Sequence, residues 1–247
     1  MRLIDDISSI ARTDDGATLI ETLVAIVMGV LVIGALCGIL VISLHQSKRT
    51  TDRVDANQRG RIAMTRIVNE LHSACISQGF TPIQAESKEN ELRFQNAYSK
   101  EAVIPRSEAW EHRIVYANET LRDYRYPATG GASPTFTFSS TATPSGGTLL
   151  ASHVTKTESK PIFSYYKYAT TSTVGSATES TTTLTSLGTA TLTTTTAPTA
   201  ASVLINFTVA PSNGSEQRGR AVPFSTQVTL AFSSPAVETP IQAAPCE

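Results

Sequence analysis

Residues 22–44 read TLVAIVMGVLVIGALCGILVISL, which is 23 consecutive positions without a charged side chain. A helix rises about 1.5 Å per residue, so this stretch would extend about 35 Å and cross the roughly 30 Å hydrocarbon core of a bilayer. Buried helices of soluble proteins rarely contain an apolar run of this length. The stretch therefore predicts a membrane-spanning helix near the start of the chain.

Two kinds of cleaved export signal are alternative interpretations of the same stretch. A secretory signal has an apolar region of about 7–15 residues followed by small residues at its cleavage site, and this run is longer and lacks that ending. A lipoprotein signal would need a small residue before its cysteine, whereas Leu36 precedes Cys37. Both alternatives are disfavoured, and Cys37 is interpreted as a small apolar packing residue.

One carboxylate, Glu21, stands at the beginning of the apolar stretch. A charge at membrane depth costs a few kcal/mol, and such residues usually face a partner. No Lys or Arg lies within one helical turn of Glu21. The nearest cation would be a new terminal amine on Ala17, if the chain were cut between Gly16 and Ala17.

Residues 16–21, GATLIE, followed by more than 20 apolar residues, resemble the class III signal of type IV prepilins and pseudopilins. The resemblance implies that a membrane-embedded prepilin peptidase cuts after Gly16 and N-methylates Ala17. It also implies that Glu21, at mature position five, sets the register of assembly by pairing with the terminal amine of a neighbouring subunit. A buried pair of this kind penalises every incorrect offset between subunits.

Two features depart from the usual pattern of that family. Ala17 stands where Phe or Met is common, and the leader, residues 1–16, contains four Asp against two Arg where a basic leader is usual. Lys48 and Arg49 follow the apolar stretch, so the positive-inside rule alone would place the C-terminal side in the cytoplasm. The prepilin resemblance implies the opposite orientation, with the C-terminal part outside the cytoplasm.

The helix is expected to continue well beyond the membrane stretch. No proline occurs between Ala17 and Pro82, so one helix from Ala17 to about Gln78, about 93 Å long, is predicted. The expected organisation is a leader (1–16), a transmembrane half-helix (17–44), an amphipathic half-helix (45–78) and a head (79–247). The predicted apolar stripe of the second half-helix consists of Val54, Ile62, Ile67, Leu71 and Ala74.

The head is expected to be rich in β-strands. Alternating or β-branched patterns predict strands at 91–94, 113–116, 121–126, 161–168, 202–209 and 225–232, with a short hairpin loop at 117–120. One long helix followed by strands predicts an α+β fold in which the helix packs on an antiparallel sheet. The hairpin, PIFSYY at 161–166 and the last strand pair resemble the J-type minor pseudopilins and minor pilins.

Residues 169–202 contain 15 Thr and 5 Ser among 34 positions. This composition buries little apolar surface, so a surface loop or flexible low-complexity insertion is the leading interpretation. Part of it remains compatible with a strand, and Leu184, Leu187 and Leu192 are candidates for contact with the head.

Cysteines and glycines supply the remaining candidate sites. Cys75 and Cys246 would both lie outside the membrane in a pilin topology, where a disulfide between them would persist; two free thiols are the alternative. Gly34 and Gly38 have the small-xxx-small spacing of close helix packing, although membrane helices also tolerate glycine without such packing.

The sequence contains no pattern typical of an enzyme or of a cofactor or metal site. Its charged fraction is 17% and its net charge is -1, which does not favour nucleic-acid binding. Basic residues between Lys48 and Arg66 favour a solvated helix face, partly paired with Asp52, Asp55 and Glu70, over a DNA-uptake surface.

These observations predict a minor pilin or pseudopilin, a structural subunit of a type IV pilus or a type II secretion filament. Its expected partners are other pilin subunits, the prepilin peptidase and methyltransferase, and the cytoplasmic membrane. Its expected location is the cytoplasmic membrane, with the head outside the cytoplasm, and then a cell-surface or periplasmic filament. The alternative is a single-pass, adhesin-like surface protein that does not polymerise.

Overall fold

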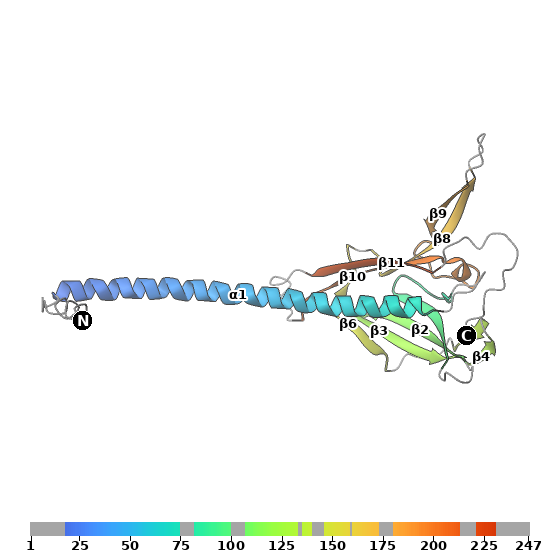
Figure 1. Cartoon of the computed structure of the whole chain (residues 1–247), viewed down its shortest axis with the longest axis horizontal. Coiled ribbons are helices and arrows are strands. Elements are labelled where there is room, and N and C mark those ends of the chain that lie inside the picture. Colours follow the sequence, from blue (N-terminus) through green and yellow to red (C-terminus); the bar gives the residue numbers. More distant parts are fainter. Residues whose placement is uncertain are drawn as a thin grey trace, which may run out of the picture. The chain divides into compact units, whose positions relative to one another are not determined.

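The computed structural model describes residues 18–74, 82–99, 107–132, 135–139, 146–158, 160–172, 180–212 and 221–230. The chain divides into two compact units, Met1–Arg49 and Thr50–Glu247. Helix α1, Leu19–His72, supplies residues to both units (Figure 1). The predicted α+β fold, with a helix packed against antiparallel sheets, is confirmed.

Helix α1 ends at His72, before the predicted end at Gln78. The amide of Ala74 donates to the carbonyl of Leu71 at 3.2 Å, an i to i−3 bond that tightens the last turn. Ala74 then pairs with Asn96 of the first strand in an isolated antiparallel bridge. The helix ends at the position where the backbone of Ala74 pairs with a strand. Proline and glycine, the usual signals of a helix end, do not mark this position in the sequence.

Two antiparallel sheets form most of the second unit, with an additional short hairpin. The first sheet has the order β1-β2-β3-β6, formed by β1 (Glu91–Ser99), β2 (Ser107–Ala117), β3 (Thr120–Pro127) and β6 (Thr148–Ser152). The second has the order β11-β10-β8-β9, formed by β11 (Val222–Thr229), β10 (Ser202–Val209), β8 (Phe163–Ser172) and β9 (Ser180–Ser186). Strand β7 (Val154–Thr155) pairs with β10. Strands β4 (Gly130–Ala132) and β5 (Thr135–Thr137) form a separate hairpin, and Ala197–Thr199 form a 3₁₀ turn.

The predicted strands are all present, with shifted ends. β10 has the predicted bounds, 202–209, whereas β11 occupies 222–229 instead of 225–232. Ser202 pairs with Thr229 and Val209 with Val222, so the length of β10 determines where β11 begins and ends.

The predicted hairpin loop at 117–120 is a two-residue turn. Asn118 and Glu119 both have positive φ, 48° and 55°, and Ala117 pairs directly with Thr120. Two positive φ values in succession are typical of the type I′ turn, whose twist matches that of the flanking strands. This turn sets the register of β2 against β3.

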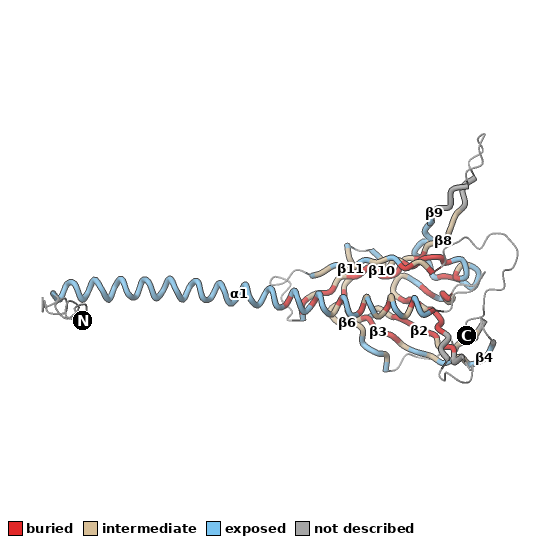
Figure 2. Tube along the Cα trace, in the orientation of Figure 1, coloured by how far each residue is buried: buried red, intermediate tan, exposed pale blue. Residues whose placement is uncertain are grey.

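The buried side of α1 differs from the predicted stripe. Val54 and Ile62 are 48% and 67% exposed, so assigning them to the buried face was wrong. The residues of α1 that are buried in the second unit are Asp52, Ala56, Gly60, Ala63, Ile67 and Leu71 (Figure 2). Small side chains at 56, 60 and 63 let the helix backbone approach the strands closely, and this close contact decides which face is buried.

The hydrophobic core of the second unit contains side chains from α1 and from both sheets. The first sheet contributes Leu92, Phe94, Ile114 and Leu121, and the second contributes Phe163, Tyr165, Val203, Ile205 and Phe207. Burying a side chain of this size contributes about 1.5–3 kcal/mol, so this shared core holds the helix between the sheets.

The Thr/Ser-rich segment belongs partly to this core. Residues 180–186 form β9, and Leu192 is only 3% exposed, with backbone hydrogen bonds to Ser87 and Glu86. Within residues 192–201 the positions 192, 197, 200 and 201 are buried and the positions 193–195, 198 and 199 are exposed, so the surface-loop interpretation holds for only part of this range. The expected contact of Leu192 with the head is confirmed. Leu187 is partly buried against the core, and Leu184 is 39% exposed.

Candidate functional site: the exposed apolar helix

Every residue of α1 from Leu19 to Arg49 is exposed in this chain (Figure 2). By length and composition, α1 is the one helix in the described part of the chain that could cross a membrane. Soluble monomeric proteins rarely expose an apolar surface this continuous. The described part of the chain does not cover residues 19–44, which is consistent with a membrane span.

Glu21 lies in the first turn of α1, and its side chain is exposed. Its amide donates to the carbonyl of Thr18 at 2.9 Å, which closes the first turn. A carboxylate at this position interacts favourably with the positive end of the helix dipole. Among the described ranges no Lys or Arg forms an ion pair with Glu21, so its carboxylate is available to a cation from another chain or from residues 1–17.

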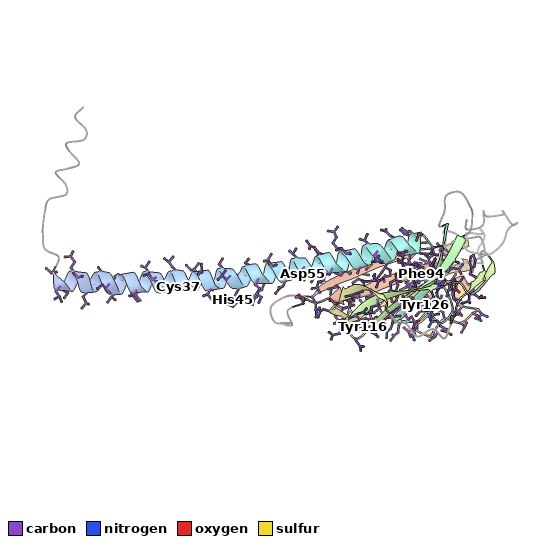
Figure 3. All side chains as sticks on the ribbon, turned by 90° about the horizontal axis from the view of Figure 1, so that it is seen from below. Cys37, His45, Asp55, Phe94, Tyr116 and Tyr126 are labelled. Carbon is purple, nitrogen blue, oxygen red and sulfur yellow. The ribbon has the colours of Figure 1, made fainter. Side chains whose placement is uncertain are left out.

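The three glycines of the apolar stretch face open space. A methyl group added at Gly29, Gly34 or Gly38 would meet nothing within 4 Å. Close packing through Gly34 and Gly38 remains a prediction about contacts with other helices. Cys37 has a free, exposed thiol, and the nearby His45 donates from Nδ1 to the carbonyl of Val41 at 2.9 Å (Figure 3).

Four predicted site residues lie outside the described ranges. They are Gly16 and Ala17, the expected cleavage and methylation site, and Cys75 and Cys246, the expected disulfide pair. These assignments stay predictions.

The basic face of α1 is only partly as expected. Arg59 pairs with Asp55 at 2.9 Å, as predicted, but it also donates to Ser152 Oγ at 3.3 Å and to the carbonyl of Ala210 at 3.5 Å. Arg59 thus ties the helix to the ends of β6 and β10. Glu70 receives hydrogen bonds from Asn96 of β1 and from Arg125 of β3.

A polar cluster surrounds Glu70 in the last turn of α1. Arg125 Nη2 donates to Glu70 Oε1 at 2.8 Å, and Asn96 Nδ2 donates to Glu70 Oε2 at 3.2 Å. His112 lies beside them, fully buried, with its ring stacked on Phe94 at a centroid distance of 5.1 Å. The cluster joins the C-terminal turn of α1 to the first sheet.

Asp123 completes this cluster from β3. His112 Nδ1 lies 3.1 Å from Asp123 Oδ1, and His112 Nε2 lies 3.8 Å from Glu70 Oε2. Arg125 Nε also donates to Asp123 Oδ2, at 3.3 Å. Glu70, His112 and Asp123 are the described residues whose ligand atoms gather closely enough to hold a metal ion.

Sequence patterns alone did not reveal this cluster, because its members come from three separate elements. One signal was available in the hairpin. Pairing Ala117 with Thr120 places His112 opposite Arg125 and Ile114 opposite Asp123, which makes His112 and Asp123 diagonal neighbours on one face. The contribution of Glu70 depends on how α1 packs and has no local signal.

A second group of charges lies on the other face of the first sheet. Arg113 and Glu111 are both nearly fully buried and form an ion pair at 2.8 Å, and the guanidinium of Arg113 lies 4.3 Å from the ring centre of Tyr126. On β1, Arg93 pairs with Glu91 at 2.5 Å and with Glu86. Each buried charge here has a partner within a few residues, which is typical of a structural arrangement.

Comparison with models of protein families gives no match to this chain. Comparison with curated proteins gives no match either.

Proposed function

We propose that this chain is a minor pilin or pseudopilin, a structural subunit of a type IV pilus or type II secretion filament. The observation that carries the proposal is the position of Glu21, a carboxylate in the first turn of a continuous, fully exposed apolar helix. A carboxylate retained in such a surface costs a few kcal/mol in lipid, so a partner is expected. The GATLIE sequence at 16–21 supplies that partner as a terminal amine on Ala17 of a neighbouring subunit.

The proposed mechanism has two stages. Cleavage after Gly16 leaves the subunit in the cytoplasmic membrane, held by residues 17–44, with its head outside the cytoplasm. Assembly then transfers the apolar helix from lipid into a bundle of similar helices. Pairing of Glu21 with the methylated amine of a neighbour selects the correct axial offset, because any other offset leaves a buried charge without a partner.

The first experiment determines the mature N-terminus by mass spectrometry of the protein expressed with a prepilin peptidase. We expect N-methylated Ala17 as the first residue. Gly16→Val should block cleavage, because a branched side chain prevents the backbone from entering the peptidase site, and the product should retain 16 more residues. Gly29→Ala, a change in the open helix surface, is the matched control and should be cleaved normally. Normal cleavage of Gly16→Val would exclude the proposed processing site.

The second experiment separates a filament subunit from a membrane-anchored adhesin that does not polymerise. Glu21→Ala should be processed and should accumulate in the membrane, but it should be depleted from sheared filaments and from crosslinks to other pilins. The neighbouring change Thr22→Ala should leave incorporation at the wild-type level. Unchanged incorporation of Glu21→Ala, relative to processed protein, would remove the assembly role of this residue. Absence of the wild-type protein itself from filaments and from crosslinks to other pilins would favour the adhesin.

A further inference from the structure

One nitrogen in the polar cluster has no hydrogen bond. His112 Nε2 is fully buried, with no hydrogen-bond partner in the structure, and it points toward Glu70 Oε2. A buried polar atom without a partner costs about 1–3 kcal/mol, so such an atom next to a carboxylate needs an explanation. We propose that Glu70 and His112 bind a divalent transition-metal ion, with Asp123 orienting the histidine ring.

The spacing of the two donor atoms fits a shared ion. His112 Nε2 and Glu70 Oε2 lie 3.8 Å apart. An ion bonded about 2.0–2.2 Å from each atom bridges donors that are roughly 3.4–4.2 Å apart, depending on the angle at the metal. The same 3.8 Å is too long for a direct N–H···O hydrogen bond. An ion therefore satisfies both atoms with little movement of either side chain.

The hydrogen bond on the other side of the ring selects the required tautomer. Asp123 Oδ1 lies 3.1 Å from His112 Nδ1, and a carboxylate only accepts, so Nδ1 carries the proton. With the Nδ1 proton directed at Asp123, Nε2 is the ring nitrogen that lies toward Glu70 and is available to a metal ion. A ligating histidine that donates its other N–H to a carboxylate is the usual arrangement at protein metal sites. The stacked ring of Phe94 keeps the imidazole plane fixed.

The donor atoms suit a divalent transition-metal ion. Among the described residues, Arg125 donates to Glu70 Oε1 and Asn96 donates to Glu70 Oε2, which also lies 3.8 Å from His112 Nε2. The mixed nitrogen and oxygen donors favour Zn²⁺ or Co²⁺ over Ca²⁺ or Mg²⁺. Glu70 is 16% exposed and borders a depression on α1 that Arg61 and Arg66 also line, so water can reach its carboxylate.

The ion would connect the last turn of α1 to β2. This role concerns the head unit alone, so it stands independently of whether the chain assembles into a filament. It also differs from the expectation drawn from the sequence, which identified no metal site.

The test uses the full-length chain in detergent, stripped of metal with a chelator, and Zn²⁺ as the probe in equilibrium dialysis. The wild type should bind one equivalent more than Glu70→Gln and His112→Gln. His72→Gln is the matched control, because His72 is an exposed histidine two residues after Glu70 at the end of α1. This variant should bind as much Zn²⁺ as the wild type. Asp123→Asn should weaken Zn²⁺ binding at least tenfold, because the carboxylate that accepts from His112 Nδ1 fixes the orientation of the imidazole ring.

Two further readouts decide the outcome. Co²⁺ bound to the wild type and to His72→Gln should show visible d–d absorption that Glu70→Gln lacks. If His112→Gln fails to fold by circular dichroism, Glu70→Gln alone decides, because its side chain is partly exposed and keeps its size. Equal Zn²⁺ stoichiometry in wild type and Glu70→Gln, or an equal loss in His72→Gln, would overturn the proposal.

Discussion

At the scale of single residues, Tyr165 shows how burial changes the chemistry of a side chain. Its sequence neighbours Tyr166 and Tyr168 are half-buried, as expected for one strand surface, but Tyr165 is only 1% exposed. Its hydroxyl donates to the carbonyl of Glu91 at 3.0 Å and to that of Lys88 at 3.3 Å. Burial raises the pKa of the Tyr165 phenol above its ordinary value, because the phenolate would lose its hydration.

This shift predicts a pH dependence of stability. The folded protein holds the Tyr165 proton more tightly than the unfolded chain, so its contribution is complete below the unfolded pKa of about 10 and is lost as the pH rises above it. Tyr165→Phe should lower the free energy of unfolding by about 1 kcal/mol near pH 8, since both carbonyls keep backbone donors. Above pH 10 the free energy of unfolding of Tyr165→Phe should fall less steeply with pH than that of the wild type. The difference in slope should be up to about 1.4 kcal/mol per pH unit.

The measurement is urea unfolding of the full chain in non-ionic detergent between pH 8 and 11. Tyr166→Phe, at the next position of β8, reports the effect of removing a neighbouring hydroxyl. Curves for Tyr165→Phe and wild type that stay parallel above pH 10 would contradict the assigned role of this phenol.

At the scale of elements, the contact between α1 and the second sheet depends on Gly60. A methyl group at this position would overlap the ring of Phe224, which is itself stacked on Phe207 with a centroid distance of 5.6 Å. Glycine inside a helix normally costs about 1 kcal/mol relative to alanine. Here the small residue is retained because it lets the helix backbone lie against an aromatic side chain of β11.

We therefore expect Gly60→Ala to lower the free energy of unfolding by about 1–3 kcal/mol, because overpacking outweighs the gain in helix propensity. The cost should be largely absent in a Phe224→Ala background, where the ring has been removed. Urea unfolding of the two single variants and the double variant gives the coupling between the sites. Additive effects of the two changes would show that the ring and the helix backbone are not in contact.

At the scale of the whole molecule, the expected disulfide would join Cys75 to Cys246, two residues far apart in the chain. Ala74 is buried and paired with β1, so the chain immediately before Cys75 is held in place. A bridge from Cys75 to Cys246 would close a loop of about 171 residues and stabilise the head by up to about 5 kcal/mol through the entropy of the unfolded chain.

This bridge is expected in protein exported to the cell envelope. Peptide mapping without reduction should recover a linked peptide that contains both cysteines, and Cys37→Ala removes the third thiol so that the pairing is unambiguous. Reduction should lower the melting temperature of the exported protein. Full alkylation of both Cys75 and Cys246 in the native, non-reduced protein would reject the bridge.

Local signals account for the parts of the fold that the sequence predicted. An uncharged run of 23 residues, strand alternation and a two-residue turn at Asn118 are all encoded within a few positions, because helix period, strand period and turn dihedrals depend on near neighbours. The exposed apolar helix with Glu21 in its first turn follows from the same local information.

What the sequence alone determined is therefore the existence and order of α1 and of the strands β1, β2, β3, β8, β10 and β11, and the tertiary structure decided which of their side chains meet. Tertiary packing places Ala56, Gly60 and Ala63 on the buried face of α1 and leaves Ile62 exposed. It also places Leu192, from a Thr-rich segment, in the hydrophobic core. Packing also brought Glu70 of α1 against His112 and Asp123 of two strands. These contacts join residues far apart in the chain, and whether they form depends on the shape of the partner surface, which no short pattern records.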